Sequence, residues 1–302
     1  MKRLLEMTDP PNVFVYPGVK QHSWRSILRT ARSPQCERFF ADNVYQRYWH
    51  DGKEDWNLKD VPCVAPQFAN MWIEGYDPVF GHFGSLLQAS RNTQKKEEMI
   101  DIWRDSAFGW NRHMKKFLTT EEGEWLITVL SLTYHSAYVL AEHYNTLVCF
   151  PPVIFTADTL GRAKGDETVD KIVMGSLGAK TIDPEMHGPH FASIPALLTI
   201  SFLHCKNVIT ETKYGGKRAT GIAKRRRGYT YKLLKVGQTM FSKEQHGKHN
   251  PQGLFSMHIC RGHFKDYREN GLFGKYPGIY WCPSHIRGNP EMGIVEKDYE
   301  VM

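Results

Sequence analysis

The chain has 302 residues and a formal net charge of +7, with 41% hydrophobic and 13% aromatic residues. This composition excludes an intrinsically disordered chain, and the length allows one large domain or two of ordinary size. The positive charge favours partners that carry phosphate or other acidic groups.

The six cysteines are scattered along the chain, unlike the dense framework of a small secreted domain. The first residues, MKRLLEMTDPP, reach Glu6 and Asp9 before any apolar run develops, so we expect no signal peptide. The most apolar run, residues 125–141, is shorter than the roughly 20 residues of a spanning helix and contains His135. We therefore expect a cytoplasmic protein with no membrane partner.

The N-terminal region predicts a mixture of short elements and longer helices. Residues 1–80 are rich in Pro, Asp and aromatic side chains, and predict a short strand at 12–18 and a helix near 34–50. Apolar residues then recur every three or four positions over 99–117, which predicts an amphipathic helix.

Two further helices are predicted before the sequence pattern changes at residue 207. Thr119 and Glu122 match a capping box, which predicts a buried helix over 121–144. The tripeptide Ser-Ile-Pro at 193–195 is a favourable helix start and predicts a helix that ends near Cys205.

The character of the sequence changes after Asn207. Residues 213–237 contain nine Lys or Arg among 25 residues, and strand-like runs separated by Gly, Asn and Pro follow to the end of the chain. We therefore predict an α+β protein with a helix-rich N-terminal region, 1–205. A basic, β-rich C-terminal module, 206–302, would form a small barrel or a bent sheet.

Within this module, residues 255–267 and 279–287 are predicted to pair as an antiparallel hairpin, with Tyr267 opposite Ile279. Because side chains alternate between the two faces with period two, this register gathers ionisable and aromatic side chains on one face. The predicted set consists of Arg261, His263, Lys265, Tyr267, Trp281, His285 and Arg287.

This set suits cleavage of RNA without a metal or another cofactor. His263 and His285 would act as general acid and general base, in an order that the sequence leaves open, each contributing about 10²–10⁴ in rate. The two arginines and the lysine would neutralise charge on the phosphate, and Trp281 or Tyr267 would stack on a base. A polar strand face that is simply solvated is the alternative interpretation.

The basic segment beside this hairpin predicts a second group of contacts to nucleic acid. Its cations would bind phosphates, and its tyrosines would stack on unpaired bases. The residues concerned are Lys224, Arg225, Arg226, Arg227, Tyr229 and Tyr231. A solvated loop is again the alternative, because runs of charge are usually exposed.

Two Cys-x-x-His pairs, Cys260 with His263 and Cys282 with His285, have the number and types of ligands of a structural zinc site. Residues three apart on a strand lie on opposite faces, however, so both pairs would have to sit in turns. We expect no metal, and a zinc-stabilised nucleic-acid-binding module is a third hypothesis.

Several motifs resemble an uncharacterised family of proteins from bacteriophages and bacteria. They are PQFANMWIEG (66–75), HCKNVITE (204–211), HICRGHFKDY (258–267), LFGKYPGIYWCPSHIRG (272–288) and the terminal VEKDYEV. The resemblance implies a phage or mobile-element origin and an intact two-part architecture, and supplies no catalytic residues. The family lacks cysteine at the positions of Cys260 and Cys282, which argues against zinc.

The leading hypothesis is therefore a phage or mobile-element protein that binds RNA or single-stranded nucleic acid, and cuts RNA through the hairpin residues. The second is a non-enzymatic phage protein whose Arg-Gly-His surface, residues 261–263, recognises a protein partner.

Overall fold

The structure is a computed structural model of the chain. It describes residues 3–8, 10, 12–15, 23–44, 61–77, 81–93, 98–99, 119–134, 146–150, 153–164, 193–215, 229–235, 256–260, 262–283, 285–287 and 289–294. The described helices are η1 (Leu4–Glu6, a 3₁₀ turn), α1 (Ser23–Ala31) and α4 (Ile194–His204). The described strands are β1 (Asn12–Val15), β2 (Glu37–Phe40), β3 (Asn70–Asp77), β4 (Gly81–Arg91), β5 (Glu98–Met99), β6 (Thr119–Thr120), β7 (Trp125–Tyr134), β8 (Thr146–Cys149), β9 (Val153–Ala157), β10 (Ile209–Gly215), β11 (Tyr229–Lys235), β12 (Ser256–Cys260), β13 (His263–Asp266), β14 (Ile279–Cys282), β15 (His285–Arg287) and β16 (Asn289–Ile294).

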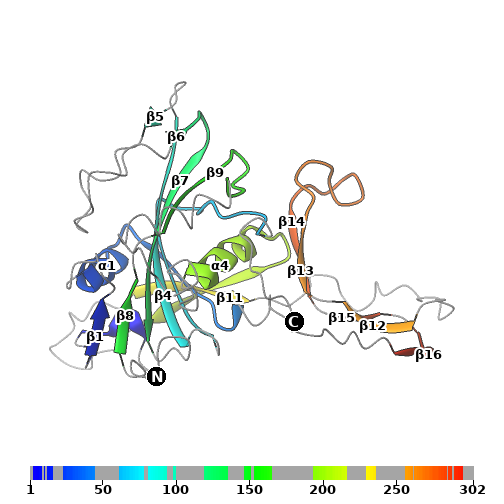
Figure 1. Cartoon of the computed structure of the whole chain (residues 1–302), viewed down its shortest axis with the longest axis horizontal. Helices are drawn as coiled ribbons and strands as arrows, with labels where there is room; N and C mark the ends of the chain where they lie inside the picture. Colours follow the sequence, from blue (N-terminus) through cyan, green and yellow to red (C-terminus); the bar gives the residue numbers. More distant parts are fainter. Residues whose placement is uncertain are drawn as a thin grey trace, which may run out of the picture.

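A large mixed sheet dominates the described part of the chain (Figure 1). Eight of its nine strands follow the order β1-β8-β7-β4-β3-β2-β11-β10, and β9 also pairs with β7. The long central strands β3, β4 and β7 are antiparallel to one another, whereas β2 is parallel to both β3 and β11. Residues far apart in the sequence therefore meet as neighbouring strands.

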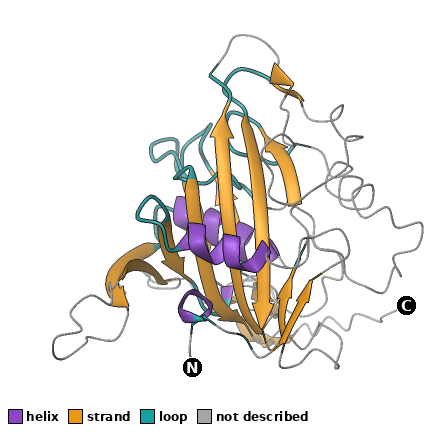
Figure 2. Cartoon of the chain, turned by 90° about the vertical axis from the view of Figure 1, so that its left-hand side faces the viewer, coloured by secondary structure: helices purple, strands orange, loops and turns teal. Residues whose placement is uncertain are grey.

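Helices cover both faces of this sheet, and Figure 2 shows a helix lying across its strands. On one face, α4 packs with side chains that include Met71, Ile127 and Val129. On the other face, η1 and α1 pack with Leu130 and Leu132 among others. Successive residues of β7 thus enter two different cores, so the strand is apolar on both sides.

The first residues of the chain are anchored to β3 by a buried carboxylate. Glu74, which is 2% exposed, accepts hydrogen bonds from the amides of Leu4 (2.6 Å) and Leu5 (3.1 Å). It also accepts one from the Trp72 indole nitrogen at 2.8 Å. Burial raises the pKa of Glu74 to about 7, although all three donors favour its charged form.

The prediction of a helix-rich N-terminal region, 1–205, is wrong, because this part of the chain contributes most of the strands of the large sheet. The segment expected to be a helix at 121–144 contains β7, and the one expected near 34–50 contains β2. The continuous apolar run of β7 reflects burial on both faces, which removes the alternation that normally identifies a strand. The predicted helix at 99–117 lies almost wholly outside the described residues.

The predicted small barrel at 206–302 is also wrong. Strands β10 and β11 join the large sheet through pairing of β11 with β2, and the later strands form separate small ladders. Sequence and structure agree on the short strand β1, the helix α4 and the alternating strand β11. No helix within the described ranges is long and apolar enough to span a bilayer.

Candidate functional site

The hairpin of β13 and β14 packs on the C-terminal half of α4. Phe264 and Trp281 lie opposite each other in the hairpin, with ring centroids 4.9 Å apart. Both rings also contact Phe202 of α4, at centroid distances of 4.9 and 4.8 Å. Trp281 is 4% exposed, so this predicted stacking residue belongs to the core.

The hairpin register differs by one residue from the predicted one. Asp266, and not Tyr267, lies opposite Ile279. A shift of one residue moves all side chains of one strand to the other face relative to its partner. The pattern of charges could not reveal this register, because it is fixed by burial of the two aromatic rings against α4.

The shift also changes the expected pairing of the second histidine. The backbone of His285 pairs with Cys260 and not with Arg261. Arg261 itself, and the side chains of His285 and Arg287, lie outside the described part of the structure. The acid–base pair of His263 and His285 therefore stays a prediction, as do the phosphate contacts of the two arginines.

The outer face of the hairpin combines basic and aromatic side chains. His263 and Lys265 are exposed and lie opposite Cys282 and Tyr280, respectively. The Tyr267 ring follows at 6.1 Å from that of Tyr280. Burial raises the pKa of the Cys282 thiol, and the charge of Lys265 partly opposes this shift. Three of the predicted residues therefore lie close together in the structure: His263 and Lys265 on β13, and Tyr267 directly after it.

Residues 267–278, which we call the finger loop, join the two strands and extend beyond them (Figure 1). The loop is closed by backbone hydrogen bonds from Leu272 N to Tyr276 O (2.8 Å) and from Tyr276 N to Leu272 O (3.1 Å). Phe273 has a φ of 56°, which is uncommon for a bulky residue. Its side chain is 85% exposed, that of Tyr276 is 60% exposed, and Lys275 between them is exposed too.

Asn207 fixes the hairpin to the end of α4. Its side-chain amide donates to the carbonyl of Trp281 at 2.7 Å and accepts from the amide of the same residue at 2.9 Å. The neighbouring Lys206 amide donates to Ile279 O at 2.8 Å. The segment after α4 therefore acts as a short extra strand along β14.

Replacing Asn207 by aspartate should loosen this attachment. The new carboxylate oxygen would face the Trp281 carbonyl, leaving two acceptors in contact, and we expect a loss of about 1–3 kcal/mol in the free energy of unfolding. Urea denaturation followed by tryptophan fluorescence measures this. Asn70→Asp is the matched control, because Asn70 is used there as an acceptor from Gln88. Equal stability of the two variants would contradict the assignment.

Arg268 attaches the base of the finger loop to two other segments. Its guanidinium binds Asp266 at 2.7 and 2.9 Å and donates to the carbonyls of Pro62 (2.7 Å) and Leu160. Burial alone would raise the pKa of Asp266, but hydrogen bonds from Arg268 and Arg162 lower it to about 2. Arg268 is thus a structural cation whose charge is largely compensated.

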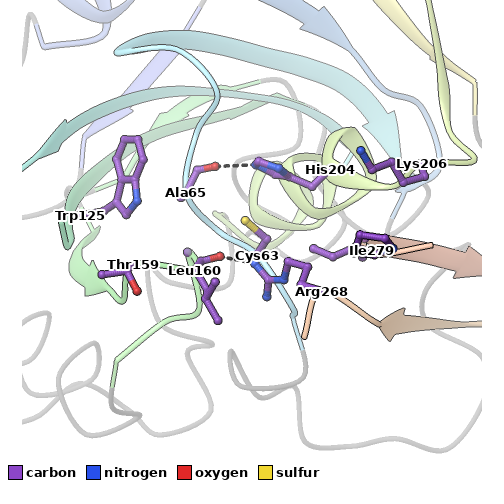
Figure 3. Close-up of a pocket in the computed structure, with 12 residues that line it drawn as sticks. Cys63, Ala65, Trp125, Thr159, Leu160, His204, Lys206, Arg268 and Ile279 are labelled. Atoms are coloured by element: carbon purple, nitrogen blue, oxygen red, sulfur yellow. Dashed lines mark hydrogen bonds between the residues drawn. The ribbon is translucent and has the colours of Figure 1, made fainter. Parts of the chain in front are cut away.

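A cavity of about 390 Å³ lies between the base of the finger loop, the end of α4 and the start of β7 (Figure 3). Its lining combines apolar side chains with several polar and charged ones. The lining residues are Cys63, Ala65, Trp125, Thr159, Leu160, Gly161, His204, Lys206, Arg268, Pro277, Gly278 and Ile279.

His204 is the titratable ring of this cavity. Its Nε2 donates to the Ala65 carbonyl at 2.9 Å, since a carbonyl oxygen can only accept. Burial lowers the pKa of His204; the hydrogen bond to Ala65 partly opposes this shift, and the charge of Arg268 adds to it. The ring is therefore neutral at physiological pH, with Nδ1 left as an acceptor.

The tyrosines of the basic segment lie elsewhere. The ring of Tyr231 contacts that of Phe40 in a tilted arrangement, with centroids 4.1 Å apart, and the Tyr229 hydroxyl donates to Glu6 at 3.1 Å. Both rings are partly buried against the core around η1 and α1. The four cations predicted beside them, residues 224–227, lie outside the described residues.

No group of three or more potential metal ligands occurs among the side chains that the structure describes. In the backbone ladders, Cys260 pairs with His285 and His263 pairs with Cys282. Because the side chains of Cys260 and His285 are outside the description, the zinc hypothesis stays a prediction.

Sequence reasoning identified the hairpin but missed the cavity and the residues that build it. Asn207, Lys206 and His204 belong to the motif HCKNVITE, which we used only for its resemblance. A polar run immediately after a predominantly apolar helix was the available signal that the helix end has a specific partner.

The chain matches no family model, no curated protein and no solved structure. The resemblance to the phage and bacterial family therefore stays a prediction.

Proposed function

We propose that the chain binds single-stranded nucleic acid, with RNA as the preferred form, through the β13–β14 hairpin and the finger loop. The observation that carries this proposal is the exposure of Phe273 and Tyr276 on a loop that is closed by its own hydrogen bonds. Exposed aromatic rings on an ordered loop can stack on unpaired bases without the cost of ordering the loop.

The charges around these rings support a polyanionic ligand. Lys265 and Lys275 are exposed on the same hairpin, and the exposed imidazole of His263 lies on the same face as Lys265. Stacking rings interleaved with cations are typical of surfaces that follow a single strand. The overall charge of +7 acts in the same direction.

Binding and cleavage are separate parts of this proposal. RNA cleavage needs a second group for proton transfer beside His263, and we assign that role to His285 on sequence grounds alone. Labelled RNA incubated in EDTA tests cleavage, with His263→Ala and His285→Ala as controls. If the RNA stays intact, or if both variants cleave it as strongly as the wild type does, the chain is a binding protein without nuclease activity of its own.

Replacing Phe273 or Tyr276 by alanine should weaken binding of a single-stranded RNA by about 5- to 150-fold each, since stacking on one base contributes about 1–3 kcal/mol. Fluorescence anisotropy with a labelled oligonucleotide measures this. Tyr76→Ala is the control, because Tyr76 is 43% exposed on β3 and away from the hairpin.

The salt dependence separates nucleic acid from a protein partner. Affinity for RNA should fall steeply between low and moderate salt, because each phosphate contact releases counterions. If the affinity for RNA does not change with salt concentration, or if Tyr76→Ala weakens binding as much as Phe273→Ala, the finger loop is not a nucleic-acid surface. Recognition of a protein through the Arg-Gly-His surface would then be the better explanation.

The proposed setting is the cytoplasm, which would be that of a bacterial host for a phage-encoded chain. The five cysteines whose side chains are described form no disulfide with one another. Free thiols in this number are the usual state in a reducing compartment.

A further inference from the structure

We propose that the cavity at the base of the finger loop binds one unpaired nucleotide of the strand, with its phosphate at Lys206. This inference rests on the proposed function, and it assigns a role to a site that is separate from the exposed rings of Phe273 and Tyr276. The ligand class is a nucleoside monophosphate unit, either free or within a strand.

The size and walls of the cavity fit this ligand. Its volume of about 390 Å³ lies in the range of sites for small organic molecules and is too small for a base pair with its backbone. Trp125 at the start of β7 and Leu160 in the turn after β9 contribute apolar surface, and Pro277 does so from the finger loop. Such walls can receive the flat faces of a base.

Lys206 is the cation that is available to a phosphate. Its ammonium group forms no ion pair with any side chain in the described ranges, whereas Arg268 is held by Asp266 and two carbonyls. A Cβ on Gly278 would lie 2.8 Å from Cγ of Lys206, so the lysine stem rests directly on the glycine. This close approach holds the lysine beside the cavity.

His204 and Thr159 add polar atoms that a base can use. The neutral His204 ring keeps Nδ1 as an acceptor because Nε2 is bound to Ala65. Thr159 lines the same space with a hydroxyl group that can donate or accept. A neutral acceptor inside a small, partly apolar site favours the amino edge of a base over a second anionic group.

The cavity and the surface assigned to stacking share the finger loop. Pro277 and Gly278, which line it, directly follow the exposed Tyr276 in the chain. A strand that stacks on Tyr276 and continues toward the base of the finger loop would reach the cavity and could place one unstacked nucleotide inside. For a single strand, unstacking costs only a few kcal/mol.

Isothermal titration calorimetry of the full chain with AMP, adenosine and inorganic phosphate tests the proposal. AMP should bind at least about tenfold more tightly than adenosine or phosphate alone, because the base site and the phosphate site act together and the contact of the phosphate with Lys206 is charge-assisted. Lys206→Gln should remove the preference for AMP over adenosine. Lys213→Gln, at a partly exposed lysine of β10 that does not line the cavity, should leave it unchanged.

Failure of this proposal can be told apart from failure of the proposed function. If RNA binds through Phe273 and Tyr276 but AMP does not bind, or binds equally well to Lys206→Gln, the cavity is not a nucleotide site while the finger loop stands. If AMP binds and RNA binding is indifferent to both aromatic residues, the cavity assignment holds and the proposed function fails.

Discussion

Replacement of Gly75 by alanine is expected to destabilise the chain by about 3 kcal/mol or more, since it forces an added carbon into closely packed backbone. A Cβ at this position would lie 2.0 Å from the carbonyl oxygen of Ala41, far inside contact distance. The backbone of Gly75 and the carbonyl group of Ala41 cannot easily move apart, because the Ala41 amide donates a hydrogen bond to Glu74 O at 3.0 Å. The parallel strands β2 and β3 would have to separate.

The same substitution at Gly274 provides the matched control. Gly274 has a φ of +69°, and no atom lies within 4 Å of its added Cβ. Its replacement by alanine therefore adds only the left-handed backbone strain, about 1–2 kcal/mol. Urea unfolding curves of the two variants should differ clearly in midpoint. A Gly75→Ala variant as stable as Gly274→Ala would contradict the close approach of β2 and β3.

Glu74→Gln is expected to cost about 2 kcal/mol near pH 5. Each oxygen of Glu74 accepts from a backbone amide of the first turn, and one also accepts from the indole of Trp72. A protonated carboxyl group keeps lone pairs on both oxygens, whereas the amide nitrogen of glutamine accepts nothing. At least one buried donor would lose its partner. Glu37→Gln, at a half-exposed carboxylate on β2, should change stability by less than about 0.5 kcal/mol.

The pH dependence of this effect has a definite sign. The pKa of Glu74 is raised in the folded state to about 7, from 4.5. Its contribution is therefore fully present below about pH 4.5 and is lost as pH rises to about 7, on the order of 3 kcal/mol. The gap between wild type and Glu74→Gln should narrow between pH 5 and pH 8 in urea unfolding. A gap that widens with pH would show that the three donors outweigh burial.

The sequence allowed the local elements with clear chemical signals to be predicted. The Ser-Ile-Pro start of α4, the alternation of β11 and the hairpin around residue 270 are all visible as patterns of a few residues. The strand β7 was not visible, because a strand between two cores lacks alternation and resembles a buried helix. Of its partners on either side, β8 is the next strand in the chain, whereas β4 is separated from β7 in sequence by β5 and β6.

In the candidate site, too, some features could be predicted from the sequence and others depend on three-dimensional packing. Exposed aromatic and basic residues near position 275 could be suspected from composition, but the face that each occupies depends on one residue of register. That register follows from the fit of Phe264 and Trp281 against Phe202, which is a three-dimensional property. The cavity depends on Asn207 and Arg268, whose partners lie 74 to more than 200 residues away along the chain.

The packing of α4 on the sheet has a consequence for synthesis on the ribosome. The face of the sheet that α4 covers includes Ile127 and Val129, which are translated well before the helix. At about 5–20 residues per second, this apolar face would be uncovered for several seconds in each nascent chain. Translation speed between β9 and α4, and chaperones that bind apolar strands, should therefore set the yield of folded protein.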